Sequence, residues 1–295
     1  MAGSNDLVAV VTRTKDRPLL LRRALLSVKN QTYENHIHIL VNDNGDENTI
    51  KDVLRELHIT PIDARLITIN SGGHMEATSN AGLEIAKELG AKFVVIHDDD
   101  DSWSSDFLSV MTSELSRYQE LAPSVAGIIC RANRVYEKID GNTITVDHFE
   151  PHATILPEVG ILDVADLFDD KNNFAPIQFL YELRAWVELD GYNPQLTTYG
   201  DWDFNLRFLE KYDIAAIPNY LAFYHWRLTS TGVDSNSIVG KNYQKETCRQ
   251  VVLNRLQRKY GNVSIYSKIA QIQTELQKLG EKVDALQQNK KHTAV

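Results

Sequence analysis

Four consecutive aspartates, Asp98 to Asp101, follow an apolar segment at residues 93–96. Adjacent carboxylates repel one another, and burial makes their ionised forms still less favourable, so a divalent cation would relieve both costs. Mg²⁺ and Mn²⁺ are typically held by one or two carboxylates together with phosphate oxygens and water. In an extended segment Asp98 and Asp100 would point to one side, and Asp99 and Asp101 to the other. The run favours a metal-bound phosphate ester; the alternative is a solvated acidic turn.

Polar residues also follow the three earlier apolar segments of the chain. They lie at residues 12–16, 42–45 and 70–74. In an open parallel sheet, ligands bind in the crevice beyond the carboxyl ends of the strands. If the apolar segments are parallel strands, all four polar edges converge on one crevice.

Asp43 has two interpretations that the spacing supports equally. Asn42-Asp43-Asn44-Gly45 is composed of typical turn residues, so Asp43 can simply shape a turn. A carboxylate can also accept a hydrogen bond from the N–H of a uracil ring or from ribose hydroxyls.

The elements that must position these residues follow from hydrophobic periodicity. Apolar, β-branched segments alternate with amphipathic ones, which is typical of βαβ units and a mainly parallel sheet. We expect strands at residues 7–11, 37–41, 66–69 and 93–96, and helices at residues 17–30, 49–57 and 77–89. The middle of the chain predicts a hairpin across residues 125–146, strands at 179–183, 214–217 and 221–224, and a helix at 202–212.

The C-terminal segment has a heptad pattern. Its apolar residues are spaced alternately by four and three: Ile265, Ile269, Ile272, Leu276, Leu279, Val283 and Leu286. This spacing favours a coiled coil over a single amphipathic helix packed on the body of the protein. We expect the chain to form a homo-oligomer through residues 263–288. Because Ile, Leu and Val are mixed at the apolar positions, the sequence does not specify the number of helices in the coiled coil.

Composition excludes several classes of protein. The chain has 295 residues and a formal net charge of −9, which argues against a general nucleic-acid binder. No apolar run reaches the roughly 20 residues that span a bilayer, and the N-terminus does not resemble a secretory signal. Cys130 and Cys248 cannot form a disulfide framework, and no Gly-x-Gly-x-x-Gly follows the first strand. A cytoplasmic location is expected.

Six segments, in order, resemble glycosyltransferase family 2, whose members are inverting, nucleotide-sugar-dependent enzymes of the GT-A fold. They are residues 8–18, 27–33 (SVKNQTY), 41–45 (VNDNG), 70–82, 97–103 (HDDDDSW) and 191–204, which includes YGDWDF. The resemblance spans about residues 7–232. It implies an α/β fold with a Rossmann-related mixed sheet, mainly parallel and flanked by helices.

The resemblance also implies a domain organisation. A GT-A domain would occupy residues 1–240, with a nucleotide-binding half at about 7–103 and an acceptor-binding half at about 104–240. A connecting helix at residues 241–262 would lead to the coiled coil.

Carried onto this sequence, the resemblance implies a role for individual residues. Asp43 would contact the nucleotide base, Asp98 the ribose or metal-bound water, and Asp100 the metal that bridges the diphosphate. Asp201 would be the catalytic base, with Asp203 as second candidate because Gly200 stands where the family often has Glu. Other expected nucleotide contacts are Thr12, Arg13, Thr14, Asn70, Gly73, Asn80 and Asp99.

One departure concerns the residues that would hold the diphosphate. The family's segment with Arg before His reads Tyr224-His225-Trp226-Arg227 here, so the two have exchanged places. Either His225 or Arg227 would meet the phosphates, and His225 is also a candidate metal ligand. The alternative is a hydrogen-bonded histidine at a strand end.

The expected function is therefore transfer of a sugar, with inversion, from a nucleotide-diphosphate donor (a UDP-sugar) to an acceptor hydroxyl. Mn²⁺ or Mg²⁺ is the expected cofactor, and a glycan or lipid-linked molecule the expected acceptor, in bacterial surface polysaccharide or glycan synthesis. Peripheral association with the inner face of the membrane is left open. Two alternatives remain: a sugar nucleotidyltransferase, and a catalytically silent GT-A-like assembly module.

Overall fold

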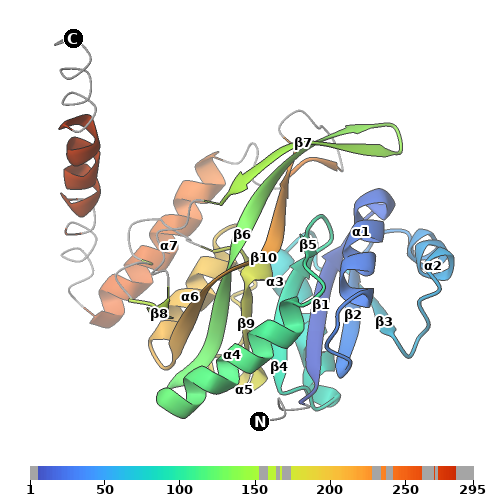
Figure 1. Ribbon diagram of the computed structural model, residues 1–295, viewed down its shortest axis with the longest axis horizontal. Coiled ribbons are helices and arrows are strands. Elements are labelled where there is room, and N and C mark those ends of the chain that lie inside the picture. The colour runs from blue at the N-terminus through green and yellow to red at the C-terminus, as the bar shows by residue number, and fades with distance from the viewer. Residues whose placement is uncertain are drawn as a thin grey trace, which may run out of the picture.

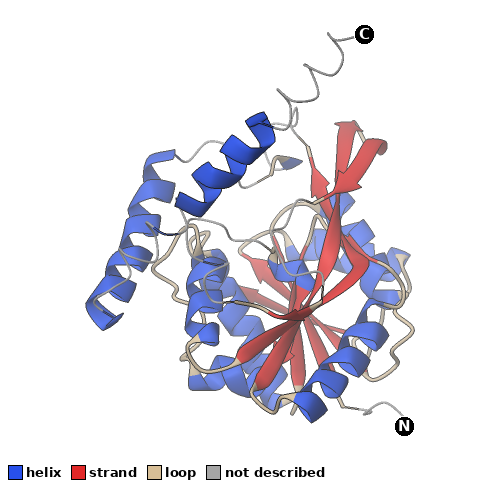
Figure 2. Cartoon of the chain, turned by 60° about the vertical axis from the view of Figure 1, so that its left-hand side comes forward, coloured by secondary structure: helices blue, strands red, loops and turns tan. Residues whose placement is uncertain are grey.

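The computed structural model describes residues 6–152, 159–163, 167, 174–227, 234–236, 242–260, 269 and 272–283. Within these residues ten strands form one sheet, in the order β3-β2-β1-β4-β9-β6-β10-β5, with β7 paired to β6 and β8 to β10. Helices cover both sides of this sheet (Figure 2). The mixed α/β architecture expected from the sequence is confirmed.

The N-terminal half of the sheet is parallel, as predicted from the alternating segments. Its strands are β1 (Val8–Thr14), β2 (His36–Asp43), β3 (Ala64–Ile69) and β4 (Phe93–Asp98). β1 pairs in parallel with both β2 and β4, and β2 pairs with β3. The carboxyl ends of all four strands therefore lie at one edge of the sheet.

The remaining strands make the sheet mixed. They are β5 (Ser102–Trp103), β6 (Val125–Asp140), β7 (Thr143–Pro151), β8 (Gly160–Ile161), β9 (Phe179–Glu182) and β10 (Asp213–Trp226). β9 runs antiparallel to its neighbours β4 and β6, whereas β6 and β10 are parallel. The two strands predicted at 214–217 and 221–224 are one strand, β10, whose register shifts mark the interruption.

The helices pack on the sheet in two layers. They are α1 (Pro18–Lys29), α2 (Glu47–Glu56), α3 (Met75–Glu88), α4 (Phe107–Leu121), α5 (Leu183–Glu188), α6 (Gly200–Leu209) and α7 (Asn242–Tyr260). Along β1, Val8 and Val10 join a core cluster with α4, whereas Ala9 and Val11 join one with α3, α5 and α6. A strand buried on both faces must be apolar throughout, which explains the continuous apolar run in the sequence.

The β6–β7 hairpin extends beyond the body of the molecule (Figure 1). It turns at Gly141, whose positive φ of 56° suits glycine. The predicted hairpin is confirmed, and it is longer than expected because β6 continues through Asp140.

The C-terminal part contains two described helical segments. Helix α7 lies where a connecting helix is expected, and its Val252 and Leu256 are buried in the main core cluster. Of the expected coiled coil, the structure describes residues 269 and 272–283, and the remainder lies outside the described residues. Among the described helices none is long and apolar enough to cross a membrane.

Candidate active site

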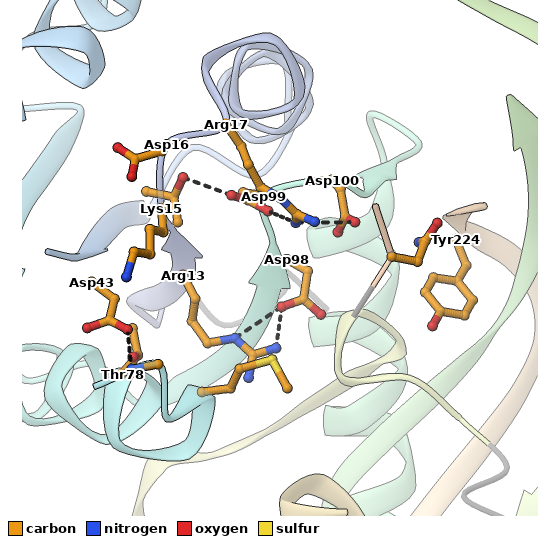
Figure 3. Close-up of a pocket in the computed structure, with 14 residues that line it drawn as sticks. Arg13, Lys15, Asp16, Arg17, Asp43, Thr78, Asp98, Asp99, Asp100 and Tyr224 are labelled. Atoms are coloured by element: carbon orange, nitrogen blue, oxygen red, sulfur yellow. Dashed lines mark hydrogen bonds and ion pairs between the residues drawn. The ribbon is translucent and has the colours of Figure 1, made fainter. Parts of the chain in front are cut away.

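A cavity of about 360 Å³ opens at the carboxyl edge of the parallel strands. Residues from the ends of β1, β2 and β4 and from the start of α3 line it, so the predicted convergence of the strand ends is confirmed (Figure 3). The lining side chains include Arg13, Thr14, Lys15, Asp16, Arg17, Asp43, Met75, Thr78, Asp98, Asp99, Asp100, Tyr224 and Asn236. Three cations and five carboxylates thus share one cavity.

The four aspartates form a turn rather than an extended segment. The backbone N–H of Asp101 donates to the carbonyl of Asp98 at 3.2 Å, so the chain reverses directly after β4. Asp98 and Asp100 reach the cavity, and Asp99 lines it while accepting from the Thr14 hydroxyl at 2.8 Å. Asp101 is buried and accepts the backbone N–H of His225 at 2.9 Å, which joins the end of β4 to β10.

Arginines neutralise the aspartates that face the cavity. Arg13 donates to Asp98 through Nε at 3.0 Å, and Arg17 donates to Asp99 at 2.9 Å and lies 3.5 Å from Asp100 (Figure 3). Arg227 forms an ion pair with the same Oδ2 atom of Asp100. Burial nevertheless raises the pKa of Asp99 to about 6 and that of Asp101 well above its ordinary value.

Asp98 and Asp100, the predicted metal ligands, each have one carboxylate oxygen that arginine does not occupy. Each uses one carboxylate oxygen for arginine, and the other makes no hydrogen bond with the residues that the structure describes. Two such oxygens beside a cavity are the protein share of a typical Mg²⁺ or Mn²⁺ site, which phosphate oxygens and water complete. No cluster of three or more His, Cys, Asp or Glu ligands occurs among the described residues.

The surroundings of His225 do not favour the predicted contact with a metal or with the phosphates. Its Nδ1 lies 2.9 Å from Glu137 Oε2, and its Nε2 lies 2.9 Å from Ser102 Oγ, so both ring nitrogens are used inside the protein. His225 lines neither of the cavities described here. It is the hydrogen-bonded strand-end histidine of the alternative interpretation.

Arg227 is a supporting residue and does not face the cavity. Its side chain is fully buried and bridges Glu137 Oε1, at 2.7 Å, and Asp100. Its Nε donates to the carbonyl of Asp234 at 2.8 Å. The cations that do reach the cavity with Arg13 are Lys15 and Arg17, which sequence reasoning did not select. Their place directly after β1, next to Arg13 and Thr14, was the available signal.

The other predicted nucleotide contacts divide into two groups. Asp43 lines the cavity, and its carboxylate also accepts the backbone N–H groups of Ser71 at 2.7 Å and Gly73 at 3.0 Å. Gly73 lines the cavity as well. Asp43 therefore organises the loop after β3 and remains available to a ligand through its other lone pairs.

Thr12, Asn70 and Asn80 do not reach the cavity. Thr12 is fully buried and hydrogen-bonded to His38 at 2.7 Å, and Asn70 is an exposed loop residue. Asn80 accepts from the Trp186 indole N–H at 3.0 Å and donates to the Tyr192 carbonyl at 2.8 Å, so it joins α3 to the loop before α6. Their predicted contact with the nucleotide is not supported by these positions.

A second cavity of about 340 Å³ adjoins the first. Arg13, Met75, Asp98 and Tyr224 line both. The second cavity also contains Glu76, His152, Thr198, Tyr199, Asp201, Trp226 and Lys245. Asp98 therefore lies between the two cavities, and a ligand in the first cavity would lie next to a ligand in the second.

The two base candidates, Asp201 and Asp203, are in different surroundings. Asp201 lines the second cavity. Asp203 is 1% exposed and paired with Arg207 at 2.8 Å and with Arg255 at 2.5 Å, so it points into the protein. This geometry favours Asp201 over Asp203 as the predicted base.

Glu76 is a cavity residue that sequence reasoning missed. It is 4% exposed, and burial, with a smaller contribution from Asp201, raises its pKa to about 7. The sequence around Glu76 has no motif that indicates a functional role. The one indirect indication is Gly200, against which the Glu76 side chain packs.

Comparison with known proteins agrees with this arrangement. Residues 9–148 match the model described as glycosyl transferase family 2. The chain is 24% identical over 257 residues to the uncharacterized glycosyltransferase YwdF of Bacillus subtilis, covering 86% of this chain and 84% of that protein. The match covers just under half of the chain, and over these residues the chain resembles glycosyl transferase family 2.

Two solved structures have a similar fold. S. aureus TarS 1–349 in complex with UDP-GlcNAc superimposes with a TM-score of 0.59 and 14% identity, over 85% of this chain and 66% of that one. Mannosyltransferase PcManGT from Pyrobaculum calidifontis, in complex with GDP-Man and Mn²⁺, gives a TM-score of 0.57 and 13% identity. The superposition covers 88% of this chain and 67% of that one. The chain thus has the GT-A fold and spans about two thirds of these two chains.

Proposed function

We propose that this chain transfers a sugar from a nucleotide-diphosphate donor, a UDP-sugar, to an acceptor hydroxyl with inversion at the anomeric carbon. The observation that carries the proposal is the pair of adjoining cavities that share Asp98 and Arg13. One cavity has the charged groups that a nucleotide diphosphate requires, and the other contains a carboxylate suited to act as base.

The first cavity suits the donor. Lys15 and Arg17 supply cations for the diphosphate, and Asp43 supplies acceptor oxygens for the base or ribose. Asp98 and Asp100 would hold Mg²⁺ or Mn²⁺, which acts as a Lewis acid on the developing charge of the nucleoside diphosphate. TarS and PcManGT are solved with UDP-GlcNAc and with GDP-Man and Mn²⁺, which supports a donor of this class.

The second cavity suits the acceptor. Asp201 takes the proton of the attacking hydroxyl, and Tyr199 and Trp226 offer aromatic surface to a sugar ring. One base and direct attack from the side opposite the leaving group give inversion. The acceptor we propose is a glycan or a lipid-linked sugar in bacterial surface polysaccharide or glycan synthesis, at the cytoplasmic face of the membrane.

A thermal-shift panel tests the donor class. UDP, GDP, ADP and their sugars are added to the full chain with and without Mn²⁺, because a ligand that binds only the native state raises its melting temperature. We expect UDP and at least one UDP-sugar to raise the melting temperature, and Mn²⁺ to increase the effect. If no nucleotide diphosphate changes it, the proposal fails. Pyrophosphate release from a nucleoside triphosphate and a sugar phosphate would instead identify a nucleotidyltransferase.

A further inference from the structure

The start of α6 is packed directly against the side chain of Glu76. A Cβ atom at Gly200 would lie 2.0 Å from Glu76 Oε1, 2.2 Å from its Cγ and 2.3 Å from its Cδ. No carbon atom fits at such distances, so the carboxyl of Glu76 fills the space that any side chain at position 200 would enter.

Glu76 reaches this position from a different helix. It is the second residue of α3, and Asp201 is the second residue of α6, so both helices begin at the second cavity. The nearby backbone N–H groups of Gly200 and of Glu76 itself lower the pKa of the Glu76 carboxyl, against the larger effect of burial. Unpaired N–H groups at a helix start favour a negative charge there. The Glu76 carboxyl lies beside the first residues of both α3 and α6.

One oxygen of Glu76 is still unused. Oε2 is buried and has no hydrogen-bond partner among the residues that the structure describes. A buried acceptor without a partner is costly, so a ligand hydroxyl in the cavity would be a favourable partner. The other charged and titratable groups that line the same cavity are Arg13, Asp98, His152, Tyr199, Asp201, Tyr224 and Lys245.

We propose that Glu76, from α3, positions Asp201 by packing against the first residue of α6. This inference rests on the proposed function, because it assigns a positioning residue to the acceptor side of that reaction. A side chain at position 200 would displace the carboxyl of Glu76 from its observed place. In this chain residue 76 provides the carboxylate, and residue 200 has no side chain.

An exchange experiment tests the inference. The variants are Glu76→Gln, Glu76→Ala, Gly200→Glu and the double variant Glu76→Ala/Gly200→Glu, with Glu47→Gln as the matched control. Glu47 lies in the first turn of α2, outside both cavities, so its substitution reports the general effect of removing a carboxylate from a helix start. Each variant is measured for melting temperature, for UDP affinity with Mn²⁺ and for UDP release from a panel of UDP-sugars.

The expected pattern separates positioning from folding. Glu76→Gln and Glu76→Ala should lower kcat at least tenfold with UDP affinity unchanged, and Gly200→Glu should lower the melting temperature. The double variant should recover both the melting temperature and most of the turnover. Near pH 7 the turnover of the wild type should change with the ionisation of Glu76, and Glu76→Gln should lack this change.

Two results overturn the inference. One is wild-type turnover in Glu76→Ala, and the other is a double variant no more stable than Gly200→Glu alone. If the wild type neither binds UDP nor releases it from any donor, the proposed function has failed. The melting temperatures then still decide whether Glu76 and Gly200 share one space: recovery in the double variant supports the shared space, and no recovery rejects it.

Discussion

Asp98, Asp99, Asp100 and Asp101 are identical side chains in four different surroundings. Asp98, Asp99 and Asp100 line the cavity beside arginines, whereas Asp101 is buried away from it, and the pKa values of Asp99 and Asp101 are raised. Burial is the main cause in both, because it disfavours the ionised form. The run therefore contains two side chains suited to a metal and two that join the end of β4 to its neighbours.

Substitution of the proposed base gives the first prediction. Asp201→Asn keeps the shape of the side chain and removes its ability to take a proton, so turnover should fall by about 10²–10⁴-fold. UDP affinity with Mn²⁺ should not change, because Asp201 lies in the second cavity and not in the first. Turnover is followed by UDP release. Wild-type turnover in this variant would assign the base to another residue.

Substitution of the proposed metal ligand gives the second prediction. Asp100→Ala should abolish the dependence of UDP binding on Mn²⁺, which calorimetry with and without the ion measures. The control is Asp52→Ala, which removes an exposed carboxylate from α2. Equal UDP affinity in wild type and Asp100→Ala, under both conditions, contradicts the metal assignment.

At the scale of the elements, helix starts and strand ends build the site. The cavities lie where β1, β2 and β4 end and where α3 and α6 begin. Packing sets these positions closely: a Cβ at Gly82 of α3 would lie 2.3 Å from Val11 of β1. Only glycine lets α3 approach the sheet this far, and the approach brings Glu76 to the start of α6.

The shared carboxylate of these helix starts predicts a pH-dependent stability. Because folding raises the pKa of Glu76 from 4.5 to about 7, its contribution is fully present below pH 4.5 and is lost as the pH rises through 7. The stability of the wild type relative to Glu76→Gln should fall by roughly 3 kcal/mol across this range. Urea unfolding of both proteins at several pH values measures the difference. A difference that does not vary with pH would show that Glu76 titrates normally.

At the scale of the whole molecule, an apolar seam lies apart from the core. Ile269, Ile272, Leu276, Leu279 and Val283 are 46%, 56%, 64%, 59% and 46% exposed. The helical segment at residues 272–283 is drawn apart from the sheet in both overall views (Figures 1 and 2). A single helix packed on the body would cover this seam, so its exposure favours the coiled-coil interpretation among the described residues.

Self-association through residues 263–288 is the corresponding prediction. Sedimentation of the full chain at micromolar concentration should give a multiple of the monomer mass, and Leu276→Asp, in the seam, should give the monomer because a buried charge is costly. Lys278→Asp introduces the same charge outside the seam and should leave the assembly intact. A wild type that sediments as a monomer excludes the proposal.

Much of this architecture could be predicted from the sequence. Apolar segments alternating with amphipathic ones indicate parallel strands, and parallel strands place their polar ends together whatever the details of packing. Asp98, Asp100, Asp43 and Asp201 were found in this way or by family resemblance, because each stands at a fixed place relative to an element. The helix boundaries and the long β10 were less accurately predicted, since register shifts leave no simple pattern.

Only the tertiary structure decided two things. One is the direction in which polar side chains point, and the other is which residues far apart in the sequence pack against each other. His225 and Arg227 look like ligands in the sequence, but Glu137 binds both inside the protein. Glu76 has no motif of its own and becomes significant only because Gly200 leaves room for it. Local sequence pattern sets the position of an element. The direction of each side chain and the residues that it contacts depend on packing between segments far apart in the chain.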